Sequence, residues 1–457
     1  MAERYGFRSQ KTMSDKATLD RNFKHPGYWP SQWPVECGGN RRQKAAVGRL
    51  DASGNHPSVT TITNNRWNVM AVQRDLGEWY IGGTMPAFSG PPPYGWVKKI
   101  NPISLETIVE SPQLPCGDHV WCGAILAHTN GSIMSVNGSF MHRLDPQDLS
   151  IICERELPIS RAHNGLLSLS DGTLVTKDLR LEAQGGTTLT FLEPEGLTVL
   201  QTLVLPEGSM GRIAADYTDG IESIFVPGTE HIWKIEMVDG TGIITDWKAQ
   251  YRTSKSDVGL AWDSCISENH LWLMDCGDIN AVRAIHNTVP NGRFEGLEGR
   301  KQLSWQLPAP WNGAQRLLRV NQKTGHVDDI EPFGNPGGGI IAPPVNVPEY
   351  QLVIAWDSIN GGLAGISTDG TLEPSWHLDV RPTMQPVIYP ESGELVINDF
   401  TANQSDDLIV VDIESGELVS RVATGSRIAN GMFLSPGENR DVYYCSTLSF
   451  ARISWAQ

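Results

Sequence analysis

Short apolar segments separated by turns of Gly, Asp, Asn and Pro repeat along most of this 457-residue chain. The stretch GLLSLSDGTLVTKD at 165–178 contains a strand, an Asp-Gly turn and a second strand, and LTFLEPEGLTVLQTLVLP at 189–206 adds a third and a fourth. The turn between third and fourth strands recurs as RLDPQDLSI at 143–151, VNQKTGHVD at 320–328 and VDIESGELV at 411–419. A repeated unit of four strands predicts the blades of a β-propeller.

The spacing of the first strands predicts the number of blades. Most intervals lie in the low to middle forties, which is the length of a four-stranded blade. We therefore expect an all-β, eight-bladed propeller of four-stranded antiparallel blades, with seven blades as the alternative. The first strands begin near Val69, Ala124, Leu166, Ile213, Leu260, Ile341, Val387 and Met432.

A ring of blades has to close, because an open edge strand leaves backbone groups unpaired. The last unit supplies three strands, in IANGMFLSPGEN, RDVYYCST and FARISWA, and SVTTITN at 58–64 can supply the fourth. AAVGRLD at 45–51 also has the pattern of a strand and competes with FARISWA for one place. We expect three C-terminal strands and one N-terminal strand to close the ring.

The N-terminal region divides the chain into two parts. HPGYWPSQWPVECGGN at 25–40 is too aromatic for a free tail. We expect residues 1–57 to form an arm that packs on the propeller or on a second subunit, which would make a homo-oligomer. Residues 58–457 would form a single propeller domain.

Polar and aromatic side chains stand where the chain enters the first strands. These segments should open on one face around the axis, together with the long connections at 84–96 and 276–315. There, arginines can bind carboxylates or phosphates, a histidine can exchange protons, and tryptophans can form an apolar wall. We expect His163 and His119 to transfer protons and Asp118 and Asp257 to orient a histidine or hold a metal. Substrate would contact Arg161, Arg212, Arg427, Arg66, Trp67 and Trp121.

Each of these residues also has a structural interpretation. An Asn before a Gly can satisfy backbone groups at a strand start. Arg66 and Arg427 can form ion pairs between blades, and His163 can be a hydrogen-bonded core histidine. The sequence leaves both interpretations open.

Composition limits the partners. The formal net charge of −16 argues against nucleic acid and anionic membranes, which need a cationic face. We see no secretory signal and no apolar run of the roughly 20 residues that a membrane span needs. Seven scattered cysteines without a CxxC pair are typical of reduced thiols, so we expect a cytoplasmic protein.

Three phrases carry a resemblance at superfamily level. They are the turn at Asp412–Leu418, the HNG and SDG phrases at 163–172, and ANGMFLSPG at 429–437. From about residue 58 onward the chain resembles quinoprotein-like, YVTN-type and gluconolactonase/strictosidine-synthase-like propellers. In the gluconolactonase-like group an Asn before the Gly of a first strand binds a divalent cation. The resemblance therefore implies Asn164 and Asn430 as ligands of a Ca²⁺- or Mg²⁺-like ion.

We expect an enzyme with a small-molecule site on the propeller axis. Its chemistry would be acid–base, with or without a metal, in a hydrolase, lyase or isomerase acting on an anionic or polar metabolite. One alternative is a non-catalytic protein-interaction propeller. Another is a quinone- or metal-dependent oxidoreductase, although the chain lacks the adjacent cysteines of quinone-dependent dehydrogenases.

Overall fold

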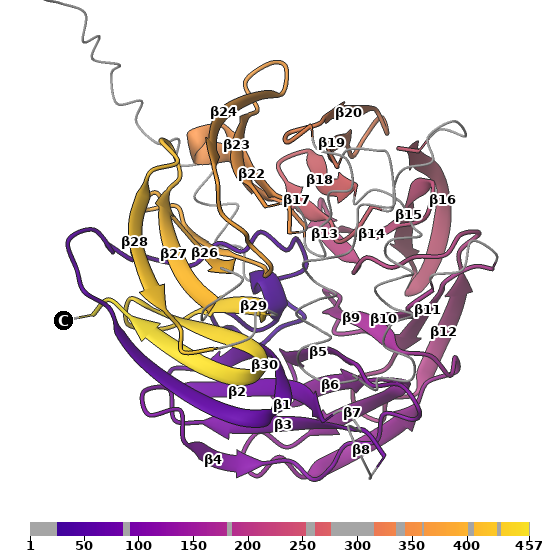
Figure 1. Cartoon of the computed structure of the whole chain (residues 1–457). Coiled ribbons are helices and arrows are strands. Elements are labelled where there is room, and N and C mark those ends of the chain that lie inside the picture. The colour runs from indigo at the N-terminus through magenta and orange to yellow at the C-terminus, as the bar shows by residue number, and fades with distance from the viewer. Residues whose placement is uncertain are drawn as a thin grey trace, which may run out of the picture.

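A computed structural model describes residues 25–85, 92–180, 185–252, 261–275, 315–334, 343–358, 361–400, 406–426 and 431–456. In these ranges the strands form seven hydrogen-bonded sheets, arranged in a ring around a common axis (Figure 1). The fold is an all-β propeller. No helix in the described ranges is long and apolar enough to cross a membrane.

Six sheets contain four antiparallel strands each, with the first strand nearest the axis (Figure 1). One sheet consists of β5 (Cys122–Ala127), β6 (Ile133–Asn137), β7 (Phe140–Leu144) and β8 (Ile151–Glu156). The next consists of β9 (His163–Ser168), β10 (Leu174–Asp178), β11 (Thr188–Leu192) and β12 (Val199–Val204). The third consists of β13 (Ala214–Thr218), β14 (Ile221–Pro227), β15 (His231–Val238) and β16 (Thr241–Gln250). The fourth consists of β17 (Cys265–Ser267), β18 (His270–Asp275), β19 (Arg316–Asn321) and β20 (Val327–Ile330). The fifth consists of β21 (Val345–Val347), β22 (Leu352–Trp356), β23 (Leu363–Ser367) and β24 (Glu373–Leu378). The sixth consists of β25 (Val387–Tyr389), β26 (Glu394–Phe400), β27 (Asp406–Asp412) and β28 (Leu418–Ala423).

The seventh sheet closes the ring, and its strands come from both ends of the chain. Its order is β29 (Gly431–Pro436), β30 (Asp441–Ser454), β1 (Ser58–Asp75), β2 (Glu78–Met85), β3 (Tyr94–Ile100) and β4 (Thr107–Glu110). Residues 58–63 of β1 pair with 449–454 of β30, which confirms closure by an N-terminal strand. Of the 45–51 segment, only Ala45 makes a bridge, to Ile388.

The count of eight blades is wrong, and the seven-bladed alternative is confirmed when blades are counted as hydrogen-bonded sheets. Two of the eight expected first strands, near Val69 and Met432, lie in the same closing sheet. The cause is the double use of two long strands. The first half of β30 pairs with β29 and its second half with β1, while the second half of β1 pairs with β2.

β30 also folds back on itself within that sheet. The backbone N–H of Trp455 donates to the carbonyl of Arg440 at 2.8 Å, and the Arg452 side chain pairs with Asp441. The closing sheet is therefore wider than the other six, and no sequence period could have revealed that its two halves share hydrogen bonds.

The repeated turn has a common hydrogen-bond pattern. In the turn after β27, the N–H of Gly416 donates to the carbonyl of Asp412, and the N–H of Asp412 donates to that of Glu417. The Asp412 carboxylate also accepts from the N–H of Ser415 at 2.8 Å. Asn101, Asp145 and Asn321 begin equivalent turns. Short polar side chains favour such turns because they bond backbone two or three residues on.

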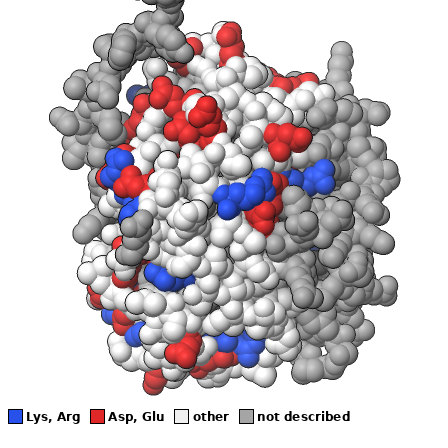
Figure 2. Space-filling model, turned by 60° about the vertical axis from the view of Figure 1, so that its left-hand side comes forward, with Lys and Arg blue, Asp and Glu red and all other residues white. Residues whose placement is uncertain are grey.

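Burial explains the strand sequences. The second strands β6 and β10 are buried along their whole length because neighbouring blades cover both faces. The outermost strand β12 alternates between exposed and partly buried residues. On the face shown in Figure 2, acidic and basic side chains are interspersed, and acidic groups gather toward its upper part.

Candidate functional site at the propeller axis

The N-terminal arm lies across the axis and bonds the first strands of most sheets. The N–H of Gln73 in β1 donates to the Trp33 carbonyl, and Ala127, Ala215, Ile266 and Ile388 of four further sheets donate in the same way to arm carbonyls. The arm's 3-10 helix, η1 (Glu36–Gly38), stands near the centre of the ring in Figure 1. The centre of the propeller is thus filled by the chain's own arm.

A ring of four buried charges joins the arm to two first-strand entrances. Arg42 Nη1 lies 2.5 Å from Glu36 Oε1, and Arg42 Nη2 lies 3.1 Å from Asp263 Oδ2. Arg212 closes the ring, with Nε 3.1 Å from Glu36 Oε1 and Nη1 3.5 Å from Asp263 Oδ2. Buried charges need such partners, because desolvating a lone charge is costly.

Backbone geometry turns the arm's polar side chains inward. Cys37, Arg42 and Lys44 have φ values of 59°, 56° and 57°. Residues other than glycine seldom adopt this left-handed region, so three such residues between positions 37 and 44 are strained, and they are retained where surrounding contacts demand it. All three side chains are buried. The strain is therefore tied to the delivery of buried polar groups to the axis.

The buried charges affect one another's ionisation. Burial alone would raise the pKa of Asp263, but Arg42 and Arg212 reverse this effect and hold that pKa below its ordinary value. Burial lowers the pKa of Lys44 on the arm. The two pKa values are thus lowered for different reasons: the neighbouring arginines lower that of Asp263, and burial lowers that of Lys44.

Arg212 is the residue of this cluster that faces aromatic and amide groups from other blades. Its guanidinium carbon lies 5.0 Å from the Phe433 ring centroid and 5.9 Å from that of Trp121. Trp121 Nε1 donates to Asn164 Oδ1 at 3.2 Å, and Asn164 Nδ2 donates to the Met210 carbonyl at 3.0 Å. The structure thus brings together three of the expected site residues, Trp121, Asn164 and Arg212.

His163 is fully buried at the start of β9. Its Nδ1 lies 3.0 Å from the Arg161 carbonyl and 3.3 Å from the Gly138 carbonyl, and both are acceptors. Nδ1 therefore carries the proton of the neutral ring, and Nε2 presents a lone pair. Nε2 has no hydrogen-bond partner in the described ranges. Burial lowers the pKa of His163 to about 4, so the neutral form prevails at neutral pH.

Lys177 and Asp178, at the end of β10, add a second titratable pair. Lys177 is fully buried, and its Nζ donates to the Ser209 carbonyl at 3.1 Å. Burial lowers its pKa to about 7. Asp178 Oδ1 accepts from the N–H of Thr188 at 2.6 Å. The electrostatic neighbours of Lys177 include Asp263 and Arg212, which places it close to the charge ring.

Arg66, Arg161, His119, Asp118 and Trp67 are the other expected site residues that the structure describes. Arg66 pairs with Glu110 of its own sheet, and Arg161 Nε lies 4.0 Å from Asp178 Oδ2. His119 Nε2 lies 3.4 Å from Ser160 Oγ, and Asp118 is exposed. Trp67 is buried in a hydrophobic core to which the arm and the sheets containing β1, β5 and β9 contribute. Asp257, Arg427 and Asn430 lie outside the described residues.

Four axial residues were not expected from the sequence: Glu36, Arg42, Lys177 and Asp263. Glu36 and Arg42 belong to the arm, whose route to the axis has no local signal. Lys177 had a weak local signal, because it is a lysine near the end of the predicted second strand LVTKD. Asp263 follows the buried Trp262 only two residues before β17 begins.

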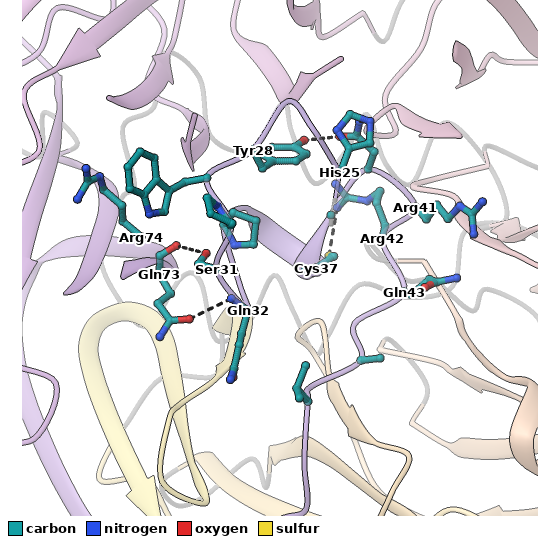
Figure 3. A pocket seen from close by; sticks show the side chains of 18 of the residues that line it. His25, Tyr28, Ser31, Gln32, Cys37, Arg41, Arg42, Gln43, Gln73 and Arg74 are labelled. Carbon is teal, nitrogen blue, oxygen red and sulfur yellow. Dashed lines mark hydrogen bonds between the residues drawn. The ribbon is translucent and has the colours of Figure 1, made fainter. Parts of the chain in front are cut away.

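A cavity of about 360 Å³ lies on the other side of the arm, at the end of the axis where first strands finish. Arg42 and Cys37 belong to its lining, and so do Gln32 and Gln73. Figure 3 shows Ser31 and Gln32 bonded to Gln73 on one side and Cys37 beside Arg42 on the other. The arm thus separates this cavity from the Arg212 end of the axis.

In the described ranges no three His, Cys, Asp or Glu side chains group closely enough to hold a metal ion. Both ends of the Asn164 amide are engaged by Trp121 and Met210. The described cysteines are free thiols.

The sequence matches no protein-family model and no curated protein. The fold is similar to quinohemoprotein alcohol dehydrogenase from Comamonas testosteroni, with a TM-score of 0.64, 9% identity, and 96% of this chain and 84% of that chain covered. It is also similar to the Dos1 propeller (TM-score 0.58, 9% identity, 90% and 98% covered) and to BamB from Moraxella catarrhalis (0.55, 12%, 87% and 98%). These similarities place the chain among β-propellers. At such low sequence identity they establish the fold alone.

Proposed function

We propose that this protein is an enzyme that binds a small anionic molecule at the Arg212 end of the propeller axis and transfers a proton to or from it. One observation carries the proposal. Arg212 is only 4% exposed, yet its Nη2 has no hydrogen-bond partner in the described part of the chain. Leaving a buried donor unpaired costs about 1–3 kcal/mol, so a ligand or water that accepts from it is favoured.

The surroundings of Arg212 suit a small ligand. Guanidinium N–H groups donate strong hydrogen bonds to carboxylate and phosphate oxygens, and the rings of Trp121 and Phe433 lie beside this guanidinium. Glu36 and Asp263 fix the orientation of the guanidinium through its other nitrogens. The anion site is therefore held in place before a ligand arrives.

Two groups in the blade formed by β9 to β12 can exchange protons. The His163 Nε2 lone pair is available as a general base at neutral pH, because Nδ1 holds the ring's proton. Lys177 has a pKa of about 7, which matches acid–base chemistry near neutrality. Hydrolysis, elimination and isomerisation all use such transfers. No metal step is included, because in the described ranges no three His, Cys, Asp or Glu side chains group closely enough to hold an ion.

The test is a thermal-shift screen of small carboxylates and phosphates, followed by titration of each hit. We expect a hit to raise the melting temperature of the wild-type protein and to lose at least tenfold in affinity in Arg212→Lys, which keeps the charge but removes the planar fork. Arg319→Lys is the matched control, since Arg319 pairs with Asp328 on the outer strands. Turnover of the hit should fall about 100-fold or more in His163→Gln or Lys177→Met.

A second candidate is the non-catalytic interaction propeller. It is favoured by the arm, which fills the axis with charges that largely neutralise one another, and by likeness to BamB and Dos1, whose names carry no enzymatic activity. If the screen yields no ligand whose binding depends on Arg212, this candidate replaces the enzyme.

A further inference from the structure

We infer that the ligand of Arg212 carries a hydrogen-bond donor beside its anionic group, as α-amino and α-hydroxy acids do, and that Glu36 of the arm recognises this donor. The inference rests on the proposed function, because it describes the molecule that Arg212 holds. It adds a residue from outside the propeller blades to the site and names the class of ligand.

Two unpartnered atoms of opposite kind stand on neighbouring side chains. Glu36 Oε2, an acceptor, and Arg212 Nη2, a donor, both lack hydrogen-bond partners in the described ranges. The side chains are joined through other atoms, with Arg212 Nε 3.1 Å from Glu36 Oε1. Both residues are at least nine-tenths buried, at 2% and 4% exposure. A molecule that reaches one of these atoms is therefore close to the other.

A simple anion satisfies only half of this pair. A carboxylate has acceptors alone, so it can bond Arg212 but brings its oxygens toward the Glu36 carboxyl without a proton to share. An α-ammonium or α-hydroxyl group supplies the missing donor, whereas an α-oxo group is a further acceptor. The donor therefore decides how well an acid of given size binds.

Asp263 provides an internal comparison. It is the other acid of the charge ring, but both of its oxygens are engaged. Oδ1 accepts from the backbone N–H of Arg212 at 2.6 Å, and Oδ2 accepts from Nη2 of Arg42 at 3.1 Å. Asp263 thus has a structural role in the ring, while Glu36 keeps one oxygen for a ligand.

The test uses four three-carbon acids of nearly equal size, namely L-alanine, L-lactate, pyruvate and propionate. The smallest acids fit wherever larger ones do, so their relative affinities report the chemistry of the site. By calorimetric or ligand-observed NMR titration of the full chain, we expect alanine and lactate to bind about tenfold or more tightly than propionate. Pyruvate should bind no better than propionate.

Variants then assign the preference to a residue. Glu36→Gln should bring the four affinities within about twofold of one another, and Arg212→Lys should weaken all four. Asp263→Asn should weaken binding without changing the ratio of lactate to propionate. If the Glu36→Gln protein does not fold, the double variant Glu36→Gln/Arg42→Gln is used in its place, because it removes one charge of each sign.

The outcomes separate the two proposals. If propionate or pyruvate binds as tightly as alanine, or if Glu36→Gln keeps the preference, the inference is wrong while the anion site stands. If none of the four acids binds, the inference fails. The proposed function fails as well if no carboxylate or phosphate of the screen binds in a way that depends on Arg212, and ordered water is then the partner of the two unpartnered atoms.

Discussion

The outer turns and the axis of this propeller are stabilised in opposite ways. In the turn that begins at Asp412, one carboxylate bonds a backbone N–H three residues later, and every partner lies within six residues. At the axis, Arg42 bonds Asp263, which is 221 residues away along the chain, and both groups are buried. Local contacts repeat from blade to blade, whereas the axial contacts occur once.

This difference has an energetic consequence. A solvated turn contact can be lost at small cost because water replaces the partner. The loss of a buried ion pair costs more, because removing one partner leaves the other charged and desolvated. The axis should therefore be far more sensitive to single substitutions than the outer strands, although both use the same residue types.

Arg42→Ala is expected to have the largest effect. It leaves Glu36 and Asp263 buried without Arg42, which should lower the free energy of unfolding by about 3–5 kcal/mol. Urea unfolding measures it. The control is Arg319→Ala on the outer strands, expected to cost at most about 1 kcal/mol. Equal effects of the two changes would remove the contrast between axis and surface.

Asp406 extends the comparison to a buried carboxyl between blades. It accepts from Tyr444 at 2.5 Å and Asn398 at 3.0 Å, and burial raises its pKa to about 7. Because the unfolded pKa is about 3.9, the folded state holds the proton between these values. Stability should therefore fall as pH rises from 4 to 7, by about 4 kcal/mol relative to Asp406→Asn. A constant wild-type-to-variant difference would show that the folded pKa is ordinary.

His163 should give the opposite pH dependence. Its folded pKa of about 4 lies below the ordinary 6.5, so the unfolded state binds the proton first as pH falls. Stability should be lost between pH 6.5 and 4, by about 3 kcal/mol in total, and His163→Gln should lose less over the same range. Unfolding curves at several pH values test this, and the same pH dependence in wild type and His163→Gln would mean that the folded pKa of His163 is ordinary.

The smallest effect is expected at the turn. Asp412→Ala removes the bonds that Ser415 makes to the carboxylate and should cost about 1 kcal/mol. Asp145→Ala, in the equivalent turn of another blade, should cost the same because its carboxylate also caps backbone. Very different costs in the two blades would show that the turns depend on blade context.

The same contrast explains what could be predicted from sequence. The strands and the turns after β7, β11, β19 and β27 follow from local patterns of apolar residues and turn formers, and closure at 58–63 follows from the need to cover an edge. The blade count failed because sharing of one sheet by β1 and β30 depends on pairing between the two ends of the chain. Arg212 could be chosen by its place before a first strand. Glu36 and Arg42 could not, because only tertiary contacts bring the arm to the axis.

The central claim is that Arg212 holds a small anionic ligand at the axis. Its most direct test is a crystal structure of the protein grown with L-lactate, examined at the Arg212 side chain. We predict density for lactate with a carboxylate oxygen within hydrogen-bond distance of Nη2. A map in which Nη2 is bonded to a residue of the chain itself, with no ligand beside it, would contradict the account.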